Sequence, residues 1–582
     1  MSIVLFRRCE RFLYPGADVL ATRLPWGRHN DTRQRALDMG RTRLLVVGGV
    51  FLLVFVVIVG RLVEITAFAS EESGREARRA PKTMVPMGRA DITDRNGIVL
   101  ATSLPTVNLY ADPRVVLDPE EAARKTVTAL PDLNFGDVLE KLSSDKSFVY
   151  LKRYLTPNQQ YEINRRGIVG LSFEQGERRV YPHGPLMAHV IGAVDTDNHG
   201  IAGLEKTFND RLTVHPDRSL SLSLDVRLQH IVRDELLRSV GEFRAMGGTG
   251  VIADVHTGEL LAMVSLPDFD PNGSQNASDA QFNRATLGLY EMGSTFKLFT
   301  ATAALDGGSA RLESRYDATN MVKFSHFTIR DYHPQNRWLS VSEIMIHSSN
   351  IGAARMALEA GTKTMREYLD RLGLLRPLPL EIPETGTPIV PNPWREINTV
   401  TVSYGHGLAV TPVHMATAIS TLVNGGIHRP ATLIRRAPEM AESGERVLKP
   451  ETSRHLRRLM RQVVEEGTGT KADVPGYFVG GKTGTAEKSR GGGYARKALL
   501  SSFVAAFPMD DPRYAVIVII DEPEGNKSTF GYATGGWTAA PAVGRVVARM
   551  APVLGIAPVH TDWTEQPVHS AIVRMVASGA KE

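Results

Sequence analysis

The longest apolar stretch lies near the N-terminus, where residues 44–60 form a run of 17 apolar or glycine residues. With Arg61 at its far end, the segment can just cross a bilayer core as a helix. A buried core helix is rarely apolar on every face over this length. A cleaved signal peptide is the alternative, since residues 67–69 resemble a cleavage site, but the leader is long for one. The pattern predicts an uncleaved transmembrane anchor at 44–63.

Past the anchor, residues 64–80 are charged and predict a stalk. From residue 81 the pattern changes to short alternating segments, and Asn96-Gly97 between two of them is a strong hairpin signal. Short helical patterns mixed with loops follow over 112–170. We expect 81–220 to be an α+β module without a catalytic cluster, serving as a spacer or docking domain.

From residue 221 the pattern is more regular. Asp225 is placed to cap an amphipathic helix that begins at Val226. Two strand pairs flank a helical middle over 295–470, and together they predict one antiparallel sheet packed by helices. The strands are expected at 250–255, 260–265, 500–507 and 514–520. The fold class is therefore α+β, with a second domain at 221–556 and a tail at 557–582.

Charge is concentrated at one end of the chain. Residues 1–43 carry nine Arg, no Lys and four acids, which accounts for the net charge of +5. Removing them from the totals of 68 basic and 63 acidic residues leaves 59 of each. A body without excess positive charge argues against a nucleic-acid partner. Cys9 is the single cysteine, and no metal-ligand spacing occurs, so no metal site is expected.

The first candidate for chemistry is Ser294, which follows Gly293 and precedes Lys297 by three residues. The alanine-rich pattern that follows predicts a buried helix ending at Gly307-Gly308. On a helix, Ser294 and Lys297 share a face, so the hydroxyl and the amine can meet. A serine beside a lysine base is a candidate nucleophile. Serine is also a common helix cap, and a second such tetrad, Ser143 to Lys146, lies in an apparent loop.

Two later motifs change this picture. Ser348 and Asn350 lie between helical patterns, 54 residues or more after Ser294. Lys482 opens a Lys-Thr-Gly-Thr segment 134 residues beyond Ser348, and its small residues predict a strand that another group approaches closely. Each motif alone is weak, because such triplets also occur in ordinary turns and edge strands. Their order and spacing together are far more specific.

With these motifs the chain resembles the class B penicillin-binding proteins, and among them the cell-division (septal) peptidoglycan transpeptidases. The resemblance covers roughly residues 85–545 and the single anchor. Met292 departs from the family, which usually has proline before the glycine. The residues that carry the resemblance are Asp94 to Gly97 with Leu100-Ala101, Gly200 to Glu205, Thr257 to Glu259, Phe269 to Asn272, Tyr290 to Lys297, Tyr404 to Gly407 and Gly481 to Glu487.

The resemblance implies roles for the motif residues. Ser294 would attack a peptide carbonyl and form an acyl ester, with neutral Lys297 as its base. Burial and the nearby Lys482 would lower the pKa of the Lys297 amine. Ser348 would relay a proton, and Asn350 would hold Lys297 and the substrate amide.

The strand at 482–485 would bind the substrate as an added β-strand. Lys482, Thr483 and Thr485 would contact its terminal carboxylate, and Gly484 would leave room for it. Backbone N–H groups of Ser294 and Thr485 would form an oxyanion hole.

The implied enzyme is a serine-type D,D-transpeptidase that cross-links stem peptides ending in D-Ala-D-Ala and is acylated by β-lactams. It would require no cofactor or metal. Its substrate lies outside the cytoplasmic membrane, so the tail at 1–43 would be cytoplasmic and the catalytic domain periplasmic, on a bacterial inner membrane. The family also implies a pedestal or dimerisation-type role for 81–220, and a membrane glycan polymerase and other division proteins as partners. An elongation-type transpeptidase, a D,D-carboxypeptidase or β-lactamase-like hydrolase, and a non-catalytic division scaffold stay open as alternatives.

Overall fold

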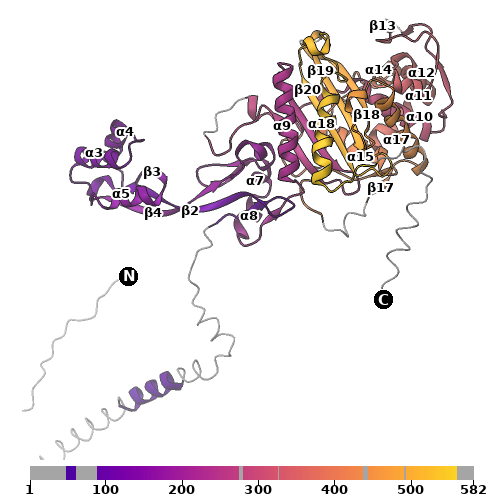
Figure 1. Cartoon of the computed structure of the whole chain (residues 1–582). Helices are drawn as coiled ribbons and strands as arrows, with labels where there is room; N and C mark the ends of the chain where they lie inside the picture. The colour runs from indigo at the N-terminus through magenta and orange to yellow at the C-terminus, as the bar shows by residue number, and fades with distance from the viewer. Residues whose placement is uncertain are drawn as a thin grey trace, which may run out of the picture. The chain divides into compact units, whose positions relative to one another are not determined.

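The computed structural model describes residues 48–60, 88–273, 279–324, 327–436, 444–490 and 493–559 (Figure 1). The predicted tail 1–43, the stalk 64–80 and nearly all of the tail 557–582 lie outside these ranges. The chain divides into two units, Met1–Val85 and Pro86–Glu582. The second unit holds both the N-terminal module and the domain that follows it.

The N-terminal module begins with the predicted hairpin, which the structure confirms. β1 (Ile92–Thr93) and β2 (Val99–Ala111) are antiparallel. Between them the Asp94 carboxylate accepts the backbone N–H groups of Asn96 and Ile98 at 2.7 and 2.9 Å. Gly97 has a φ of +85°, a conformation that glycine adopts without strain.

A long antiparallel pair, β2 with β4 (Leu171–Val180), carries a small lobe at its end. The lobe has a hydrophobic core of its own, built around residues such as Leu109, Leu142 and Leu151. The mixture of short helices and loops expected over 112–170 is therefore an independent packing unit. Its elements are η1 (Pro113–Val115), α3 (Pro119–Ala129), α4 (Phe135–Leu142), β3 (Val149–Leu155) and α5 (Pro157–Asn164).

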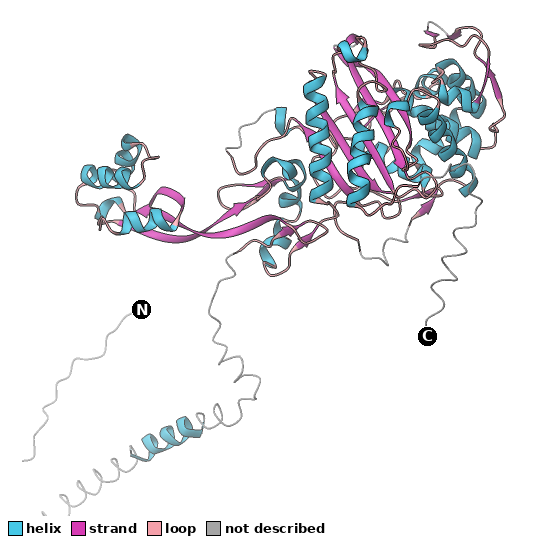
Figure 2. Cartoon of the chain, in the orientation of Figure 1, coloured by secondary structure: helices cyan, strands magenta, loops and turns pink. Residues whose placement is uncertain are grey.

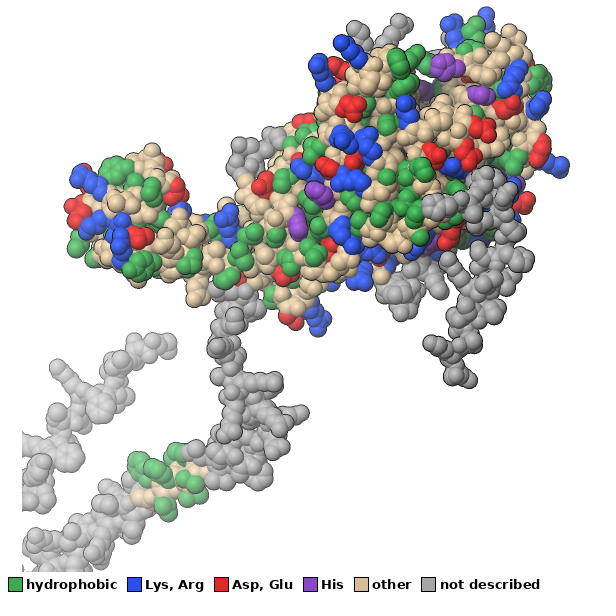
Figure 3. Space-filling model, viewed as in Figure 1, with side chains coloured by type: hydrophobic (Ala, Val, Ile, Leu, Met, Phe, Trp, Pro, Cys, Tyr) green, Lys and Arg blue, Asp and Glu red, His purple; other side chains and the backbone are tan. Residues whose placement is uncertain are grey.

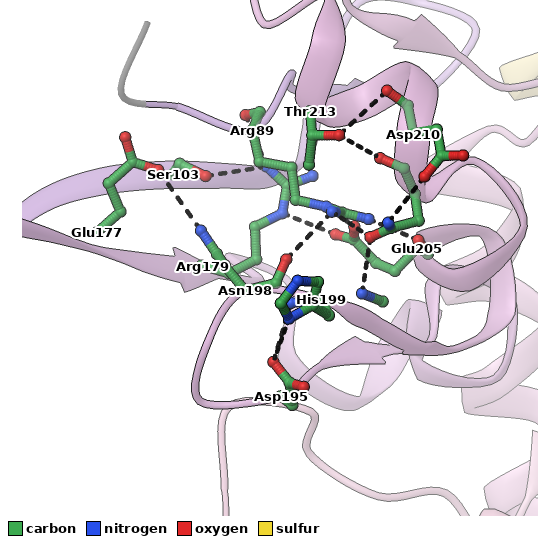
Figure 4. Close-up of polar contacts among 12 residues, drawn as sticks. Arg89, Ser103, Glu177, Arg179, Asp195, Asn198, His199, Glu205, Asp210 and Thr213 are labelled. Carbon is green, nitrogen blue, oxygen red and sulfur yellow. Dashed lines mark hydrogen bonds and ion pairs between the residues drawn. The ribbon is translucent and has the colours of Figure 1, made fainter. Parts of the chain in front are cut away.

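Short elements connect this module to the second domain. They are η2 (Gly184–Met187), α6 (Ala188–Ile191), β5 (Ala193–Val194), β6 (Gly200–Ala202), α7 (Gly203–Thr207), α8 (Asn209–Val214) and β7 (Leu220–Ser221). At their centre Glu205 is fully buried and binds Arg89 at 2.5 Å and Arg179 at 2.7 Å (Figure 4). This network ties the start of the described module to the base of the β2–β4 pair.

The second domain is built on a five-stranded antiparallel sheet of order β18-β19-β20-β8-β9 (Figure 2). Its strands come from both ends of the domain's sequence, which confirms the predicted sheet and the α+β class. β18 lies at an edge, so its outer backbone groups have no strand beside them within this sheet. The strands are β8 (Gly247–Asp254), β9 (Leu260–Leu266), β18 (Gly480–Arg490), β19 (Gly493–Phe507) and β20 (Tyr514–Asp521).

Helices cover both faces of this sheet (Figure 1). α9 (Val226–Glu242), capped by Asp225 as predicted, and α18 (Ala539–Val553) pack on one face. β20 is buried along its whole length because alternate residues enter two cores: Val516 lies in the core beneath α9 and α18, and Ile517 in the core of the opposite face.

The helical middle forms the layer on the opposite face. It contains α10 (Lys297–Asp306), α11 (Val341–Ile346), α12 (Asn350–Ala360), α13 (Thr362–Arg371), α14 (Glu396–Val402), α15 (Pro412–Val423) and α17 (Pro450–Glu465). The short strands are β10 (Tyr290–Glu291), β11 (Arg315–Asp317), β12 (Val322–Phe324), β13 (Phe327–Ile329), β14 (Trp338–Ser340), β15 (Ala409–Val410), β16 (Ile427–His428) and β17 (Glu445–Arg446). The short 3₁₀ turns are η3 (Asp279–Gln281), η4 (Gly293–Phe296), η5 (Thr470–Ala472) and η6 (Lys527–Thr529).

Figure 3 shows side chains by type, and the described parts of the two units expose different kinds of side chain. On the face shown, acidic and basic side chains of the larger unit are interspersed. The described part of the predicted anchor is a helix over 48–60, with exposed apolar side chains from Val50 to Val59. Of the helices in the described ranges, none has both the length and the apolar character needed to span a membrane.

Candidate active site

Ser294 lies in η4, a 3₁₀ turn that leads directly into α10. Gly293 has a φ of +53° and turns the chain immediately before the serine. Lys297 is the first residue of α10, and its Nζ donates to Ser294 Oγ at 2.7 Å. Ser294 is half-buried, whereas Lys297 is fully buried. The hydroxyl and the amine therefore meet, as the three-residue spacing predicts.

The second motif reaches the same amine from the turn between α11 and α12. Lys297 Nζ donates to Asn350 Oδ1 at 2.7 Å, to the Ser348 carbonyl at 2.8 Å and to Ser348 Oγ at 3.1 Å. Ser348 has a φ of +56°, an unfavourable conformation for a residue with a side chain. Backbone strain at this position indicates that the surrounding contacts hold the turn in place.

The third motif brings a second buried amine. Lys482 lies on the edge strand β18, is fully buried, and donates from Nζ to Ser348 Oγ at 2.9 Å. Burial lowers the pKa of Lys482 to about 7. Burial, and then the charge of Lys482, lower the pKa of Lys297 well below its ordinary value, while Asp331 opposes this shift. Lowering the pKa of an amine increases the fraction that is neutral near physiological pH, and the neutral form can accept a proton.

The rest of the β18 motif is held by neighbouring loops. Thr483 Oγ1 lies 2.7 Å from Thr468 Oγ1, and Thr485 Oγ1 accepts the Gly535 N–H at 3.1 Å. A Cβ on Gly484 would lie 2.6 Å from the Met292 carbonyl oxygen. Glycine is therefore required here because the backbone before the serine packs directly against β18.

A second close approach joins the same two segments. A Cβ on Gly293 would lie 2.6 Å from the Thr485 carbonyl oxygen. Two residues before Gly293, Glu291 Oε2 lies 3.0 Å from His406 Nδ1, and Glu291 Oε1 accepts the Gly407 N–H at 2.8 Å. The backbones that carry Ser294 and Thr485 are thus fixed side by side.

The second Ser-x-x-Lys tetrad, Ser143 to Lys146, lies outside this cluster. Ser143 ends α4 in the small lobe, and Lys146 follows in the loop. Neither residue belongs to the cluster around Lys297.

Sequence reasoning missed the residues that support the cluster from loops. Asp331 follows β13 by two residues, and its carboxylate accepts three hydrogen bonds from the segment Ser349 to Ile351. A single aspartate 17 residues before Ser348 has no spacing that would identify it. Thr468 and Gly535 were missed for the same reason.

The cluster is suited to acyl transfer. It combines a partly accessible hydroxyl, a buried amine within hydrogen-bond distance of it, and a second buried amine that binds the Ser348 hydroxyl. Across the described ranges, no group of three or more His, Cys, Asp or Glu residues is placed to hold a metal ion.

Comparison with known proteins assigns the family. The family model for the penicillin binding protein transpeptidase domain matches residues 248–547, just over half of the 582 residues. The chain belongs to the penicillin-binding protein transpeptidase family. A second model, the penicillin-binding protein dimerisation domain, matches residues 84–217. Both matches confirm the resemblance that the sequence motifs indicate.

Individual relatives agree with this assignment. A probable peptidoglycan D,D-transpeptidase FtsI from Caulobacter vibrioides is 42% identical over 481 residues, which cover 80% of this chain and 82% of the relative. The peptidoglycan D,D-transpeptidase FtsI of Escherichia coli K12 is 29% identical, covering 89% of this chain and 92% of the relative. A crystal structure of penicillin binding protein 3 from Mycobacterium tuberculosis, complexed with aztreonam, matches with a TM-score of 0.64. It covers 81% of this chain and 97% of its own at 22% identity, and this likeness shows the fold alone.

Proposed function

We propose that this penicillin-binding protein is a septal peptidoglycan D,D-transpeptidase that uses Ser294 as its nucleophile. The observation that carries the proposal is the contact of Lys297 Nζ with Ser294 Oγ at 2.7 Å inside a cluster completed by Ser348, Asn350 and Lys482. The relatives named peptidoglycan D,D-transpeptidase support the same substrate class.

In the first half-reaction, Ser294 Oγ attacks the carbonyl carbon of the penultimate D-Ala, and Lys297 accepts the hydroxyl proton. The C–N bond to the terminal D-Ala breaks, and that D-Ala leaves as the amine after receiving a proton. Ser348 lies between the two lysine amines and can pass the proton to the leaving nitrogen. The product is an ester of Ser294.

In the second half-reaction, the amine of a neighbouring stem peptide attacks this ester. A new amide bond forms, the ester C–O bond breaks, and Ser294 regains a proton. The same groups act in reverse order, as microscopic reversibility requires.

Substrate recognition is assigned to β18. Because β18 is an edge strand, a stem peptide can extend the sheet beside it. Lys482, Thr483 and Thr485 bind the terminal carboxylate, and Gly484 allows the peptide backbone to approach. The N–H groups of Ser294 and Thr485, on backbones fixed side by side, bind the developing oxyanion. A β-lactam carries the same carboxylate and carbonyl and acylates Ser294 in place of the substrate.

The location follows from the substrate. We assign residues 1–43 to the cytoplasm, 44–63 to a single membrane anchor, 64–80 to a stalk, and 81–220 and 221–556 to the periplasmic pedestal and transpeptidase domains. A membrane glycan polymerase and other division proteins are the proposed partners of the anchor and the pedestal.

Labelling with a fluorescent penicillin tests the nucleophile. We expect the full-length protein in membranes to be labelled, Ser294→Ala to lose the label, and Ser143→Ala to keep it. The Ser143 variant is a matched control because Ser143 begins the other Ser-x-x-Lys tetrad. Labelling that persists in Ser294→Ala would contradict the assignment.

Two further measurements separate the alternatives. Rapid release of the drug would indicate a β-lactamase, and release of D-Ala without amide formation when an acceptor amine is supplied would indicate a carboxypeptidase. Depletion of the protein should give filamentous cells for a septal enzyme, whereas rounded cells would indicate an elongation enzyme. Normal division by a Ser294→Ala strain would indicate a scaffold.

A further inference from the structure

Asp331 connects a loop outside the three motifs to the catalytic turn. It follows β13, is 9% exposed, and directs its carboxylate at the start of α12. Oδ2 accepts the Ser349 hydroxyl at 2.6 Å, and Oδ1 accepts the N–H groups of Asn350 at 2.6 Å and Ile351 at 2.9 Å. A carboxylate at a helix N-terminus is favoured by the free N–H groups and by the helix dipole. Here the carboxylate comes from a distant loop.

The adjoining residue orients the Asn350 side chain. Asn350 Nδ2 donates to the Arg330 carbonyl at 2.9 Å, so Oδ1 is the atom that faces Lys297 Nζ at 2.7 Å. Arg330 and Asp331 together therefore fix both the backbone and the amide of Asn350.

The same contacts bear on Ser348, which directly precedes the anchored segment. Its left-handed φ of +56° is strained in a residue other than glycine and persists only where neighbouring contacts hold it. The Asp331 carboxylate accepts hydrogen bonds from Ser349 and Asn350, the two residues after Ser348. Loss of these hydrogen bonds would allow the turn to relax and would move Ser348 Oγ away from the two lysines.

Charge gives Asp331 a second role. Two charged side chains act on Lys297: Lys482 from β18, which lowers its pKa, and Asp331 from the segment after β13, which raises it. Lys297 and Lys482 are both fully buried. The Asp331 carboxylate therefore offsets part of the repulsion between two amines enclosed in one site.

We propose that Asp331 is a positioning residue of the acyl-transfer reaction. Its carboxylate holds the turn from Ser348 to Asn350 against Lys297 and supplies the negative charge that partly balances the two buried lysines. This inference rests on the proposed function, because it assumes that Ser294 is acylated with Lys297 as the base.

The test compares rates of Ser294 acylation by a fluorescent penicillin as a function of pH. Asp331→Asn keeps the shape of the side chain but removes its charge. We expect its rate to fall by about tenfold to a hundredfold, as misplacement of catalytic groups does. In the plot of acylation rate against pH, the rise on the acid side (the acid limb) should move to lower pH. Loss of the carboxylate lowers the pKa of Lys297, so the amine becomes neutral at lower pH.

Ser349→Ala separates position from charge. This variant keeps the carboxylate and removes one of its three donors, so the rate should fall while the acid limb stays in place. The melting temperature shows whether Asp331→Asn folds. If it does not, the Ser349→Ala variant still tests the positioning role.

Asp225→Asn is the matched control. Asp225 is a buried aspartate that caps α9 in the same domain, so its substitution should lower the melting temperature without moving the rate or the pH profile. Rates within twofold of the unsubstituted protein in both site variants, or an acid limb that Asp331→Asn leaves in place, would overturn the proposal. Absence of labelling in the unsubstituted protein would overturn the proposed function and this inference with it.

Discussion

Lys297 and Lys482 donate to the same oxygen, Oγ of Ser348, at 3.1 and 2.9 Å. The two residues lie 185 positions apart in the sequence, on α10 and on β18. Both side chains are fully buried, so two full positive charges there would repel each other in a medium that screens them poorly. The arrangement favours one neutral and one charged amine. Burial lowers the pKa of both, and the charge of Lys482 lowers that of Lys297 further, which favours Lys297 as the neutral amine.

We predict a bell-shaped pH dependence for the acylation of Ser294. The rate should rise as Lys297 loses its proton, because the neutral amine is the base, and this limb lies well below the ordinary lysine range. It should fall as pH rises through the pKa of Lys482, about 7, because the neutral amine no longer binds the carboxylate. Penicillin labelling rates measured from acid to alkaline pH check this, and a rate independent of pH would contradict it.

Lys482→Met should lose activity and gain stability. Acylation should fall by about a hundredfold or more, because a charged hydrogen-bond partner of the substrate is removed. Because the pKa of Lys482 is lowered in the fold, the unfolded chain binds more protons between pH 7 and the ordinary lysine range. At neutral pH, burial of the Lys482 amine therefore lowers the free energy of unfolding. Replacing Lys482 with methionine should raise the melting temperature by about 2–4 °C or more.

Lys488→Met is the control on the same strand. Lys488 pairs with Asp521 and Glu522 at 2.8 Å each, and Asp521 is buried. Its substitution should therefore lower the melting temperature. Destabilisation by both substitutions would show that Lys482 contributes to folding in the same way as Lys488.

Gly293→Ala should abolish acylation. The added Cβ would lie 2.6 Å from the Thr485 carbonyl oxygen, so the two backbones that form the proposed oxyanion hole would be forced apart. Gly308→Ala is the matched control, because Gly308 also has a positive φ but no atom within 4 Å of an added Cβ. Backbone strain should cost both variants about 1 kcal/mol, and the Gly293 variant should lose more because its Cβ also meets the Thr485 backbone. The Gly293 variant alone should lose labelling, by about a hundredfold or more. Equal labelling of the two would contradict this account.

The sequence predicts the elements whose signals are local. The hairpin at Asn96-Gly97, the capped helix after Asp225 and the strand pairs of the sheet follow from turn chemistry and periodicity. The proximity of Ser294 and Lys297 follows from helical geometry.

Contacts between distant loops could not be predicted in this way. The hydrogen bonds of Asp331 to α12, and of Gly535 to Thr485, join isolated residues whose neighbours carry no periodic pattern. Such contacts depend on how the loops are packed, and a single sequence gives no measure of that packing. The separate core of the lobe at 112–170 could not be predicted for a related reason, since its members come from several strands and helices and no periodic pattern shows which of these elements pack together.

The buried ion network of the N-terminal module leads to the last prediction. Glu205 is fully buried between Arg89 and Arg179, and Arg179 also donates to the Arg89 carbonyl at 3.1 Å (Figure 4). Glu205→Ala leaves two buried guanidinium groups without their carboxylate, which should lower the free energy of unfolding by about 3–5 kcal/mol.

Asp197→Ala is the control, because it breaks the ion pair of Arg153 with a carboxylate that is 63% exposed, and should cost less than about 1 kcal/mol. Denaturant unfolding of the two variants measures the difference. Arg89 is the second residue of the described module, and Arg179 lies near the end of β4. Loss of Glu205 should therefore release the start of the module from the β2–β4 pair, detected as faster proteolysis near residue 89 in Glu205→Ala than in Asp197→Ala. Equal unfolding free energies and equal proteolysis rates would show that Glu205 does not hold this junction together.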